Sequence, residues 1–251
     1  MRRFGFLTKT IYPVLMNDKK TSFTNHLGFI DGTTLKLIAM VAMLLDHACA
    51  ALLPGWVFLH YIGRISLPIF AFCLAEGYSH THDKKKYLLR MGVFAVISEV
   101  PFDLLFNNAW LDFSYNNVLI TFFIALLGLA GYDAAVTKVK NRTAGTALGF
   151  LLIVLACGAA YFINCDHSYF AVFLVFVFYF LREQNRFVCI SVGAIMTVAM
   201  RNDGIARWTV LGCVPLLFYN GKKGRGLKWL FYVFYPVHLV ILVVLRCLLA
   251  V

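Results

Sequence analysis

Long apolar runs separated by short polar loops are the main pattern of this chain. An α-helix needs about 20 mostly apolar residues to cross a bilayer. Nine runs approach that length: 35–53, 56–78, 87–106, 116–132, 144–163, 168–181, 187–200, 208–219 and 229–250. The sixth, seventh and eighth are short, so we expect them to tilt or to be shielded by neighbouring helices. The pattern predicts an all-α, polytopic transmembrane helix bundle with about nine spans.

Two regions are expected along the chain. Residues 35–251 form the transmembrane domain. Residues 1–34 form an N-terminal cytoplasmic or interfacial segment, because charged and polar side chains interrupt it throughout. Asp31 stands just before the first long apolar run, and aspartate is a favoured residue at the start of a helix. With Gly32, Thr33 and Thr34, which follow it, Asp31 supplies helix-capping residues for the start of the first membrane helix.

The composition excludes the main soluble classes of protein. Of the 251 residues, 61% are hydrophobic, 14% are charged and 24 are Phe, whereas soluble domains average about 45–50% apolar and about 25% charged residues. A water-soluble globule of this size cannot hide so many large apolar side chains. Disorder and a disulfide-stapled secreted module are excluded as well.

Basic residues set the expected orientation, because cytoplasmic loops of membrane proteins carry an excess of Lys and Arg. Eighteen of the 23 basic residues lie in the N-terminal segment and in four alternate loops, whereas the opposite loops hold only Arg201 and Arg207. We place the N-terminus in the cytoplasm and the C-terminus outside, in a multi-pass protein of the cytoplasmic membrane. The same bias explains the formal net charge of +11 without nucleic acid as a partner. Arg201 and Arg207 are either interface residues or functional groups.

Ionisable side chains inside apolar runs are costly and usually face a partner or a cavity. At 1.5 Å per residue, His47 lies roughly 9 Å and Arg64 roughly 12 Å inside the outer ends of their helices. Two carboxylates of the third run fall near this depth, and a histidine of the ninth run lies deeper. Groups from four helices predict one polar pocket that opens outward. Its candidate residues are Asp46, His47, Arg64, Glu99, Asp103 and His238.

A histidine in such a pocket suits proton transfer, because its ordinary pKa lies near neutral pH. We predict His47 as a general base. Asp46 points about 100° away from it on the same helix, so the helper carboxylate is either Asp46 or one of the two in the third run. Arg64 either holds an oxyanion or forms a buried ion pair with a third-run carboxylate that only locks helices together. His60 is expected at the membrane interface, and the His and Cys spacings indicate no metal site.

One loop combines glycine with positive charge. In residues 220–228, glycines expose backbone amides, and Lys222, Lys223 and Arg225 can meet phosphate groups. The alternative is ordinary positive-inside charge in a tight turn.

Short motifs in matching order carry a resemblance to a known family. They are LKLIAM (35–40), LDH (45–47), GRISLPIFAF (63–72), SEVPFD (98–103), NVLIT (117–121), RW (207–208), FYNGK (218–222) and FYPVHL (234–239). In these motifs the chain resembles the TraX family, named for the conjugal-transfer pilin acetylase. The resemblance covers about 35–240, and residues 1–34 and the loop 133–143 lie outside it.

The resemblance implies an integral membrane acyltransferase, which takes an acyl group from cytoplasmic acyl-CoA and delivers it to an acceptor across the membrane. In that group a histidine early in the first core helix is the catalytic candidate, and the matching position here is His47, as the general base or as a transient acceptor of the acyl group. Acetyl-CoA is the implied donor, with Lys222, Lys223 and Arg225 as its candidate contacts. The acceptor is unspecified: a protein N-terminus, a glycan, or a small amine or alcohol.

Two other classes of function stay open on the residues alone. The first is a small-solute transporter that uses the buried charges for coupling, although no inverted repeat is visible. The second is a non-catalytic assembly protein whose charges only tie helices together.

Overall fold

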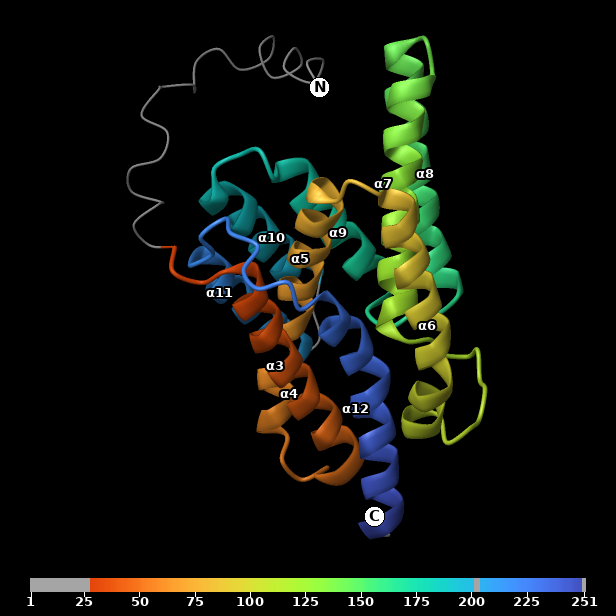
Figure 1. The fold of residues 1–251 in the computed structure, drawn as a ribbon, viewed down its shortest axis with the longest axis vertical. Coiled ribbons are helices and arrows are strands. Elements are labelled where there is room, and N and C mark those ends of the chain that lie inside the picture. Colours follow the sequence, from red (N-terminus) through yellow and green to blue (C-terminus); the bar gives the residue numbers. More distant parts are fainter. Residues whose placement is uncertain (1–27, 201–203, 250–251) are drawn as a thin grey trace.

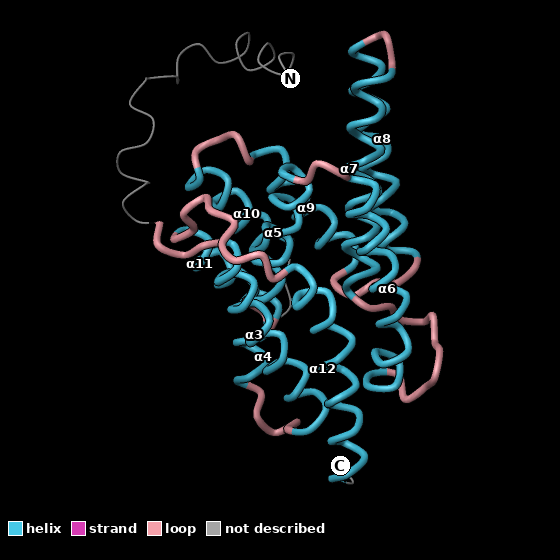
Figure 2. The backbone as a smooth tube through the Cα atoms, in the orientation of Figure 1, coloured by secondary structure: helices cyan, strands magenta, loops and turns pink. Residues whose placement is uncertain are grey.

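The computed structural model describes residues 28–200 and 204–249, and helices joined by short loops make up this part of the chain (Figures 1 and 2). The expected interfacial segment falls mainly on residues outside the described ones, as does Arg201. In chain order the helices are α3 (Gly32–Leu52), α4 (Phe58–Gly63), α5 (Ser66–His80), α6 (Lys84–Phe106), α7 (Val118–Lys138), α8 (Arg142–Phe162), α9 (Ser168–Leu181), α10 (Arg186–Met200), the 3₁₀ helix η1 (Ala206–Gly212), α11 (Cys213–Leu217) and α12 (Lys228–Leu249).

The apolar runs correspond to these helices. Five described segments are long and apolar enough to cross a membrane: α3, Phe58–His80 (which joins α4 and α5), α7, α8 and α12. Helices α9, α10 and the segment Ala206–Leu217 are apolar but shorter. The all-α bundle is therefore confirmed, with five described segments that are suited to cross a membrane. The count of nine spans stays a prediction.

Several of the described helices begin at a side chain that accepts a hydrogen bond from the first turn. The carboxylate of Asp31 accepts from the N–H of Thr34 at 2.7 Å, so the predicted start of the first membrane helix is confirmed. Asp83, Asn117 and Asn141 do the same for α6, α7 and α8. Each satisfies a backbone donor that has no partner within its own helix.

The packing of α9 and α12 shows how the bundle is assembled. Helix α9 packs against α5, α7, α8 and α10, and its buried side chains, Phe170, Leu174 and Phe178 among them, are typical of a helix surrounded by others. Helix α12 packs against α3 and α6. The last helix of the chain therefore lies beside the first membrane helix (Figure 1).

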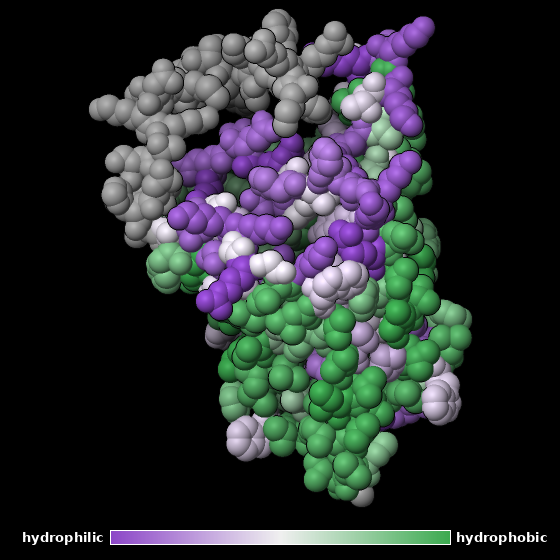
Figure 3. Space-filling model, viewed as in Figure 1, coloured by the Kyte–Doolittle hydropathy of each residue, from purple (hydrophilic) through white to green (hydrophobic). Residues whose placement is uncertain are grey.

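The loops divide between two ends of the molecule. The α5–α6, α7–α8, α9–α10 and α11–α12 loops lie toward the upper end in Figure 1, and the α3–α4 loop, the α6–α7 loop and the C-terminal end of α12 lie below. Figure 3 shows hydrophilic side chains above and a hydrophobic surface below. Trp56 and Trp110, in the lower loops, are exposed, as tryptophans at membrane interfaces are. This division agrees with the alternation of basic loops, and the side that faces the cytoplasm stays a prediction.

Reporter fusions test the orientation. A reporter that is active only in the cytoplasm should work when inserted at residues 84–86 or after Lys223, and should be silent when fused after Val251, because basic loops are retained inside. Activity after Val251 would show that one of the short helices between 168 and 219 does not cross the membrane.

Candidate functional site

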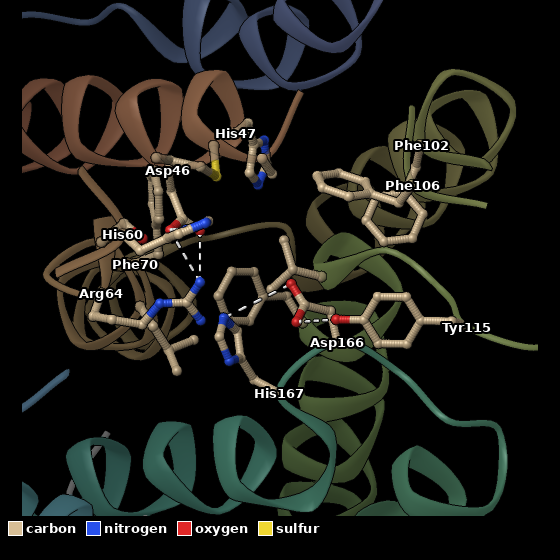
Figure 4. A pocket seen from close by; sticks show the side chains of 16 residues that line it. Asp46, His47, His60, Arg64, Phe70, Phe102, Phe106, Tyr115, Asp166 and His167 are labelled. Atoms are coloured by element: carbon tan, nitrogen blue, oxygen red, sulfur yellow. Dashed lines mark hydrogen bonds and ion pairs between the residues drawn. The ribbon is translucent and has the colours of Figure 1, made fainter. Parts of the chain in front are cut away.

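A cavity of about 130 Å³ lies in the half of the bundle away from the basic loops. Its walls come from α3, the α4–α5 segment, α6, the start of α7 and the turn between α8 and α9 (Figure 4). Aromatic rings form the apolar part of the wall. The ionisable residues that line it are Asp46, His47, His60, Arg64, Asp166 and His167. Among the described residues, no group of three or more His, Cys, Asp or Glu is arranged to hold a metal ion.

Asp46 and Arg64 form the first polar cluster of the cavity wall. Nη2 of Arg64 donates to both carboxylate oxygens of Asp46, at 3.0 and 2.8 Å, and Nδ1 of His60 lies 2.8 Å from Oδ1 of the same carboxylate. The expected pairing of Arg64 with Glu99 or Asp103 is therefore wrong. The ring of His60 belongs to this cluster, and its expected place at the membrane interface stays a prediction.

The backbone explains why Arg64 meets Asp46. Gly63 lies so close to Asp46 that a Cβ at residue 63 would stand 2.2 Å from the Cβ of Asp46. Helix α4 ends at Gly63. Pro68 has no N–H to offer the carbonyl of Arg64 four residues earlier, so α5 begins as a separate helix. A glycine contact and a helix break thus place the guanidinium against α3.

A chain of hydrogen bonds orients His47. Nδ1 of His238 lies 2.9 Å from the carbonyl oxygen of Phe234, and because a carbonyl only accepts, this nitrogen carries the proton. In neutral His238, Nε2 is then an acceptor. It lies 2.8 Å from Nδ1 of His47, which therefore donates. The lone pair of neutral His47 is left on Nε2.

This arrangement gives His47 one fixed and one open nitrogen. His47 is 8% exposed and His238 3% exposed, and this burial favours the neutral form of both rings. His238 also stacks on the ring of Phe234, with the two planes 7° apart. Within the described residues, Nε2 of His47 has no hydrogen-bond partner, and the residue lines the cavity. A general base requires such a lone pair beside the reacting group.

Glu99 and Asp103 are buried but do not line the cavity. Glu99 accepts a hydrogen bond from the side-chain amide of Asn117, which precedes α7. Asp103 accepts from Nδ2 of Asn107 at 2.9 Å and from the N–H of Asp112 at 2.8 Å. The two carboxylates share one face of α6, as their spacing predicts, but that face holds α7 and the α6–α7 loop.

The turn between α8 and α9 adds cavity residues to which the sequence assigned no role. The hydroxyl of Tyr115 donates to Oδ1 of Asp166 at 2.7 Å, and Nε2 of His167 lies 3.7 Å from Oδ2 (Figure 4). Burial acts to raise the pKa of Asp166, but His167, the Tyr115 hydroxyl and Arg64 together hold that pKa below its ordinary value. The sequence signal was an Asp-His pair between two apolar runs. Of the two outer-loop arginines, Arg207 is exposed on η1.

The basic turn between α11 and α12 lies at the other end of α3. The N–H of Gly32 donates to the carbonyl of Lys222 at 2.8 Å, and Oγ1 of Thr33 donates to the carbonyl of Arg225 at 2.7 Å. The turn therefore fastens the start of α3 through its backbone. His47 lies about 22 Å further along α3 by the helical rise. The candidate phosphate-binding side chains of the turn are exposed: Lys222, Lys223 and Arg225.

Comparison with known proteins identifies the family. A family model described as TraX protein matches residues 31–246. The chain belongs to the TraX family. This TraX-family protein is similar to the probable fimbrial assembly protein FimC, serogroup H1, of Dichelobacter nodosus, with 31% identity over 236 residues that cover 83% of this chain and 92% of the relative.

A second similarity of this TraX-family protein is shorter. The uncharacterized protein RP591 of Rickettsia prowazekii (strain Madrid E) is 33% identical over 90 residues, which cover 36% of this chain and 33% of that protein. No solved structure matches the chain.

The close approach at Gly63 predicts a stability difference between two glycine variants. Gly63→Ala should destabilise the protein by about 1–3 kcal/mol, because the added methyl group overpacks the contact with Asp46. Gly55→Ala is the matched control, since nothing lies within 4 Å of a Cβ at that position. Equal melting temperatures for the two variants in lipid nanodiscs would contradict the contact.

The pairing of Arg64 predicts a specific coupling. Removing one partner of a buried ion pair costs about 3–5 kcal/mol. Arg64 and Asp46 are 21% and 16% exposed, so we expect the lower end of that range for Arg64→Ala. Adding Asp46→Asn should recover part of the loss, whereas adding Asp103→Asn should be additive. Denaturation experiments measure these losses. Recovery with Asp103→Asn and additivity with Asp46→Asn would show that Arg64 pairs with Asp103 instead.

Proposed function

We propose that this protein is an integral membrane acetyltransferase that transfers the acetyl group of acetyl-CoA to an acceptor on the outer side of the membrane. The observation that carries the proposal is the state of His47. Its ring is held by His238 and leaves a lone pair at the cavity. Membership of the TraX family supports the proposal, because the resemblance implies acyl transfer.

The reaction needs a base for one proton. As the acceptor atom forms a bond to the thioester carbonyl carbon, Nε2 of His47 takes the proton that the acceptor releases. The resulting positive charge is stabilised by His238, whose Nε2 accepts the hydrogen bond from Nδ1 of His47. When the carbon–sulfur bond breaks, His47 returns the proton to the thiolate of CoA. The products are the acetylated acceptor and free CoA.

Arg64 provides positive charge for the carbonyl oxygen that becomes negative during the attack. It uses Nη2 for both hydrogen bonds to Asp46, and within the described residues Nη1 has no hydrogen-bond partner. Nη1 can then meet the oxyanion, where a preorganised donor is most effective. Asp46 acts as a positioning residue because it holds the guanidinium in place, and His60 contacts the carboxylate of Asp46.

The donor enters from the basic end of the bundle in this proposal. CoA is polyanionic, and the exposed Lys222, Lys223 and Arg225 are suited to its phosphates. In this proposal the flexible pantetheine arm, which carries the thioester, spans the distance of about 22 Å along α3 to His47.

The acceptor reaches the cavity from the outer side. The turn between α8 and α9 and the start of α7 border the cavity there. The similar protein of Dichelobacter nodosus is named as a probable fimbrial assembly protein. A fimbrial subunit is therefore the first acceptor to test.

Replacement of His47 tests the proposed base. His47→Ala should lower acetyl transfer about 10²–10⁴-fold, the usual range for the loss of a general base, while the protein stays folded. His238→Gln should lower it less, because His47 keeps its lone pair but loses its orientation. Release of CoA thiol and incorporation of labelled acetyl are the measurements. His80→Ala is the control, since His80 is 74% exposed at the basic end. Full activity per folded molecule in His47→Ala would overturn the mechanism.

Acetyl-CoA binding tests the donor site. A ligand selective for the folded state raises stability by about 2.7 kcal/mol at 100 times its Kd, so acetyl-CoA should raise the melting temperature. Reversal of the charges at Lys222 and Lys223 should weaken this effect, and high salt should do the same. Charge reversal at Lys138 and Lys140, in the neighbouring basic loop, is the control. An effect unchanged by the first pair of substitutions would remove the basic turn from the donor site.

A further inference from the structure

The turn that faces His47 across the cavity has an unusual backbone. Asn164, His167 and Ser168 have φ values of 52°, 57° and 49°, in the left-handed region that residues with a Cβ rarely adopt. His167 and Ser168 are consecutive, and serine, unlike asparagine and histidine, is not enriched in this region. Such conformations persist where surrounding contacts enforce them, and they concentrate at functional sites.

The surrounding contacts here come from the segment before and within α7. The N–H of Asp166 donates to the carbonyl of Asn116 at 2.8 Å, and Oγ1 of Thr121 donates to the carbonyl of Asp166 at 2.8 Å. Nδ2 of Asn164 donates to the carbonyl of Ser114 at 2.6 Å. These bonds fix Asp166 on both sides of its Cα. Their result is that the carboxylate of Asp166 and the ring of His167 are presented to the cavity (Figure 4).

The two carboxylates that line the cavity, those of Asp46 and Asp166, differ in their hydrogen-bond and ion-pair partners. Asp46 binds the permanent cation Arg64 through both oxygens and also contacts His60. Asp166 accepts on Oδ1 from the neutral hydroxyl of Tyr115, while Oδ2 has His167 at 3.7 Å, beyond hydrogen-bond distance. The side chain of Asp166 is 19% exposed. Oδ2 therefore retains capacity to accept a hydrogen bond from a molecule in the cavity.

We propose that Asp166 is the positioning residue for the acceptor, whose N–H or O–H donates to Oδ2 of Asp166 while the attacking atom lies next to His47. This inference rests on the proposed acetyl transfer, and it assigns binding of the acceptor to the turn between α8 and α9. Tyr115 fixes the carboxylate, and the left-handed turn aims it. The donor is bound by other residues, at the basic end of α3.

The separation of donor and acceptor contacts gives the test its readout. The protein in lipid nanodiscs is assayed with acetyl-CoA and three acceptor probes: a short peptide with a free N-terminal amine, glycerol, and water. Loss of a hydrogen bond to a charged group typically weakens binding about 10- to 100-fold. For the probe that serves as acceptor, we expect Asp166→Asn to raise the KM about 10- to 100-fold. The KM of acetyl-CoA should stay unchanged within about two-fold. Whether the peptide or glycerol shows the effect distinguishes an amine from a hydroxyl acceptor.

Two further variants separate positioning from folding. Tyr115→Phe keeps the Asp166 carboxylate but removes the hydrogen bond that fixes it, so this variant should raise the acceptor KM by a smaller factor. It also serves as the second variant if Asp166→Asn does not fold. Asp112→Asn is the matched control, because the Asp112 carboxylate caps its own loop at the N–H of Ser114, 2.9 Å away, and does not line the cavity.

The outcomes distinguish the two proposals. A wild-type protein that turns over acetyl-CoA with none of the probes, water included, overturns the proposed function and this inference with it. An active wild type whose acceptor KM is unchanged in Asp166→Asn and Tyr115→Phe overturns the inference alone. A parallel rise in the KM of acetyl-CoA would show that Asp166 supports the fold of the cavity and does not position the acceptor.

Discussion

The hydrogen bond from His238 to the carbonyl of Phe234 determines the state of the site. Because a carbonyl oxygen only accepts, it fixes the proton on Nδ1 of His238, the acceptor role of Nε2, and the donor role of Nδ1 of His47. The lone pair at the cavity follows from that sequence of constraints. The two rings lie on α12 and α3, so the base exists only while these helices stay packed together. At their other ends, the bonds from Gly32 and Thr33 to the basic turn hold the same two helices in place.

Buried charged groups in this bundle serve two purposes. The two kinds differ in whether their hydrogen-bonding capacity is already used by partners within the bundle. Asp103 accepts two hydrogen bonds within its own loop. Asp133 accepts from the hydroxyls of Tyr78 and Tyr179 and pairs with Lys84, so it joins four helices near the basic end. Both groups are structural, because their oxygens already have partners within the bundle. At the cavity, by contrast, Nε2 of His47, Nη1 of Arg64 and Oδ2 of Asp166 have capacity left for a substrate.

The sequence predicted those features that depend on local pattern. Runs of apolar residues predicted the helices, the capping residues at 31–34 predicted the start of α3, and helix depth placed His47 and Arg64 in one layer. The partner of Arg64 was wrong because it depends on the break between α4 and α5 and on the close contact at Gly63, which no periodicity reveals. Asp166 was missed as a cavity residue for a similar reason, since a left-handed turn held by hydrogen bonds from a distant segment sets its direction.

The protonation of the His47 ring is the most direct test of this account. In protein labelled with ¹⁵N-histidine and studied by solid-state NMR in lipid bilayers, a His47→Gln variant assigns the two ring resonances. We predict a protonated Nδ1 and an unprotonated Nε2 for His47, with the Nδ1 resonance shifted when His238 is replaced by Gln. A proton on Nε2 of His47, or a Nδ1 resonance that does not change when His238 is replaced, would contradict the assignment of His47 as a base oriented by His238.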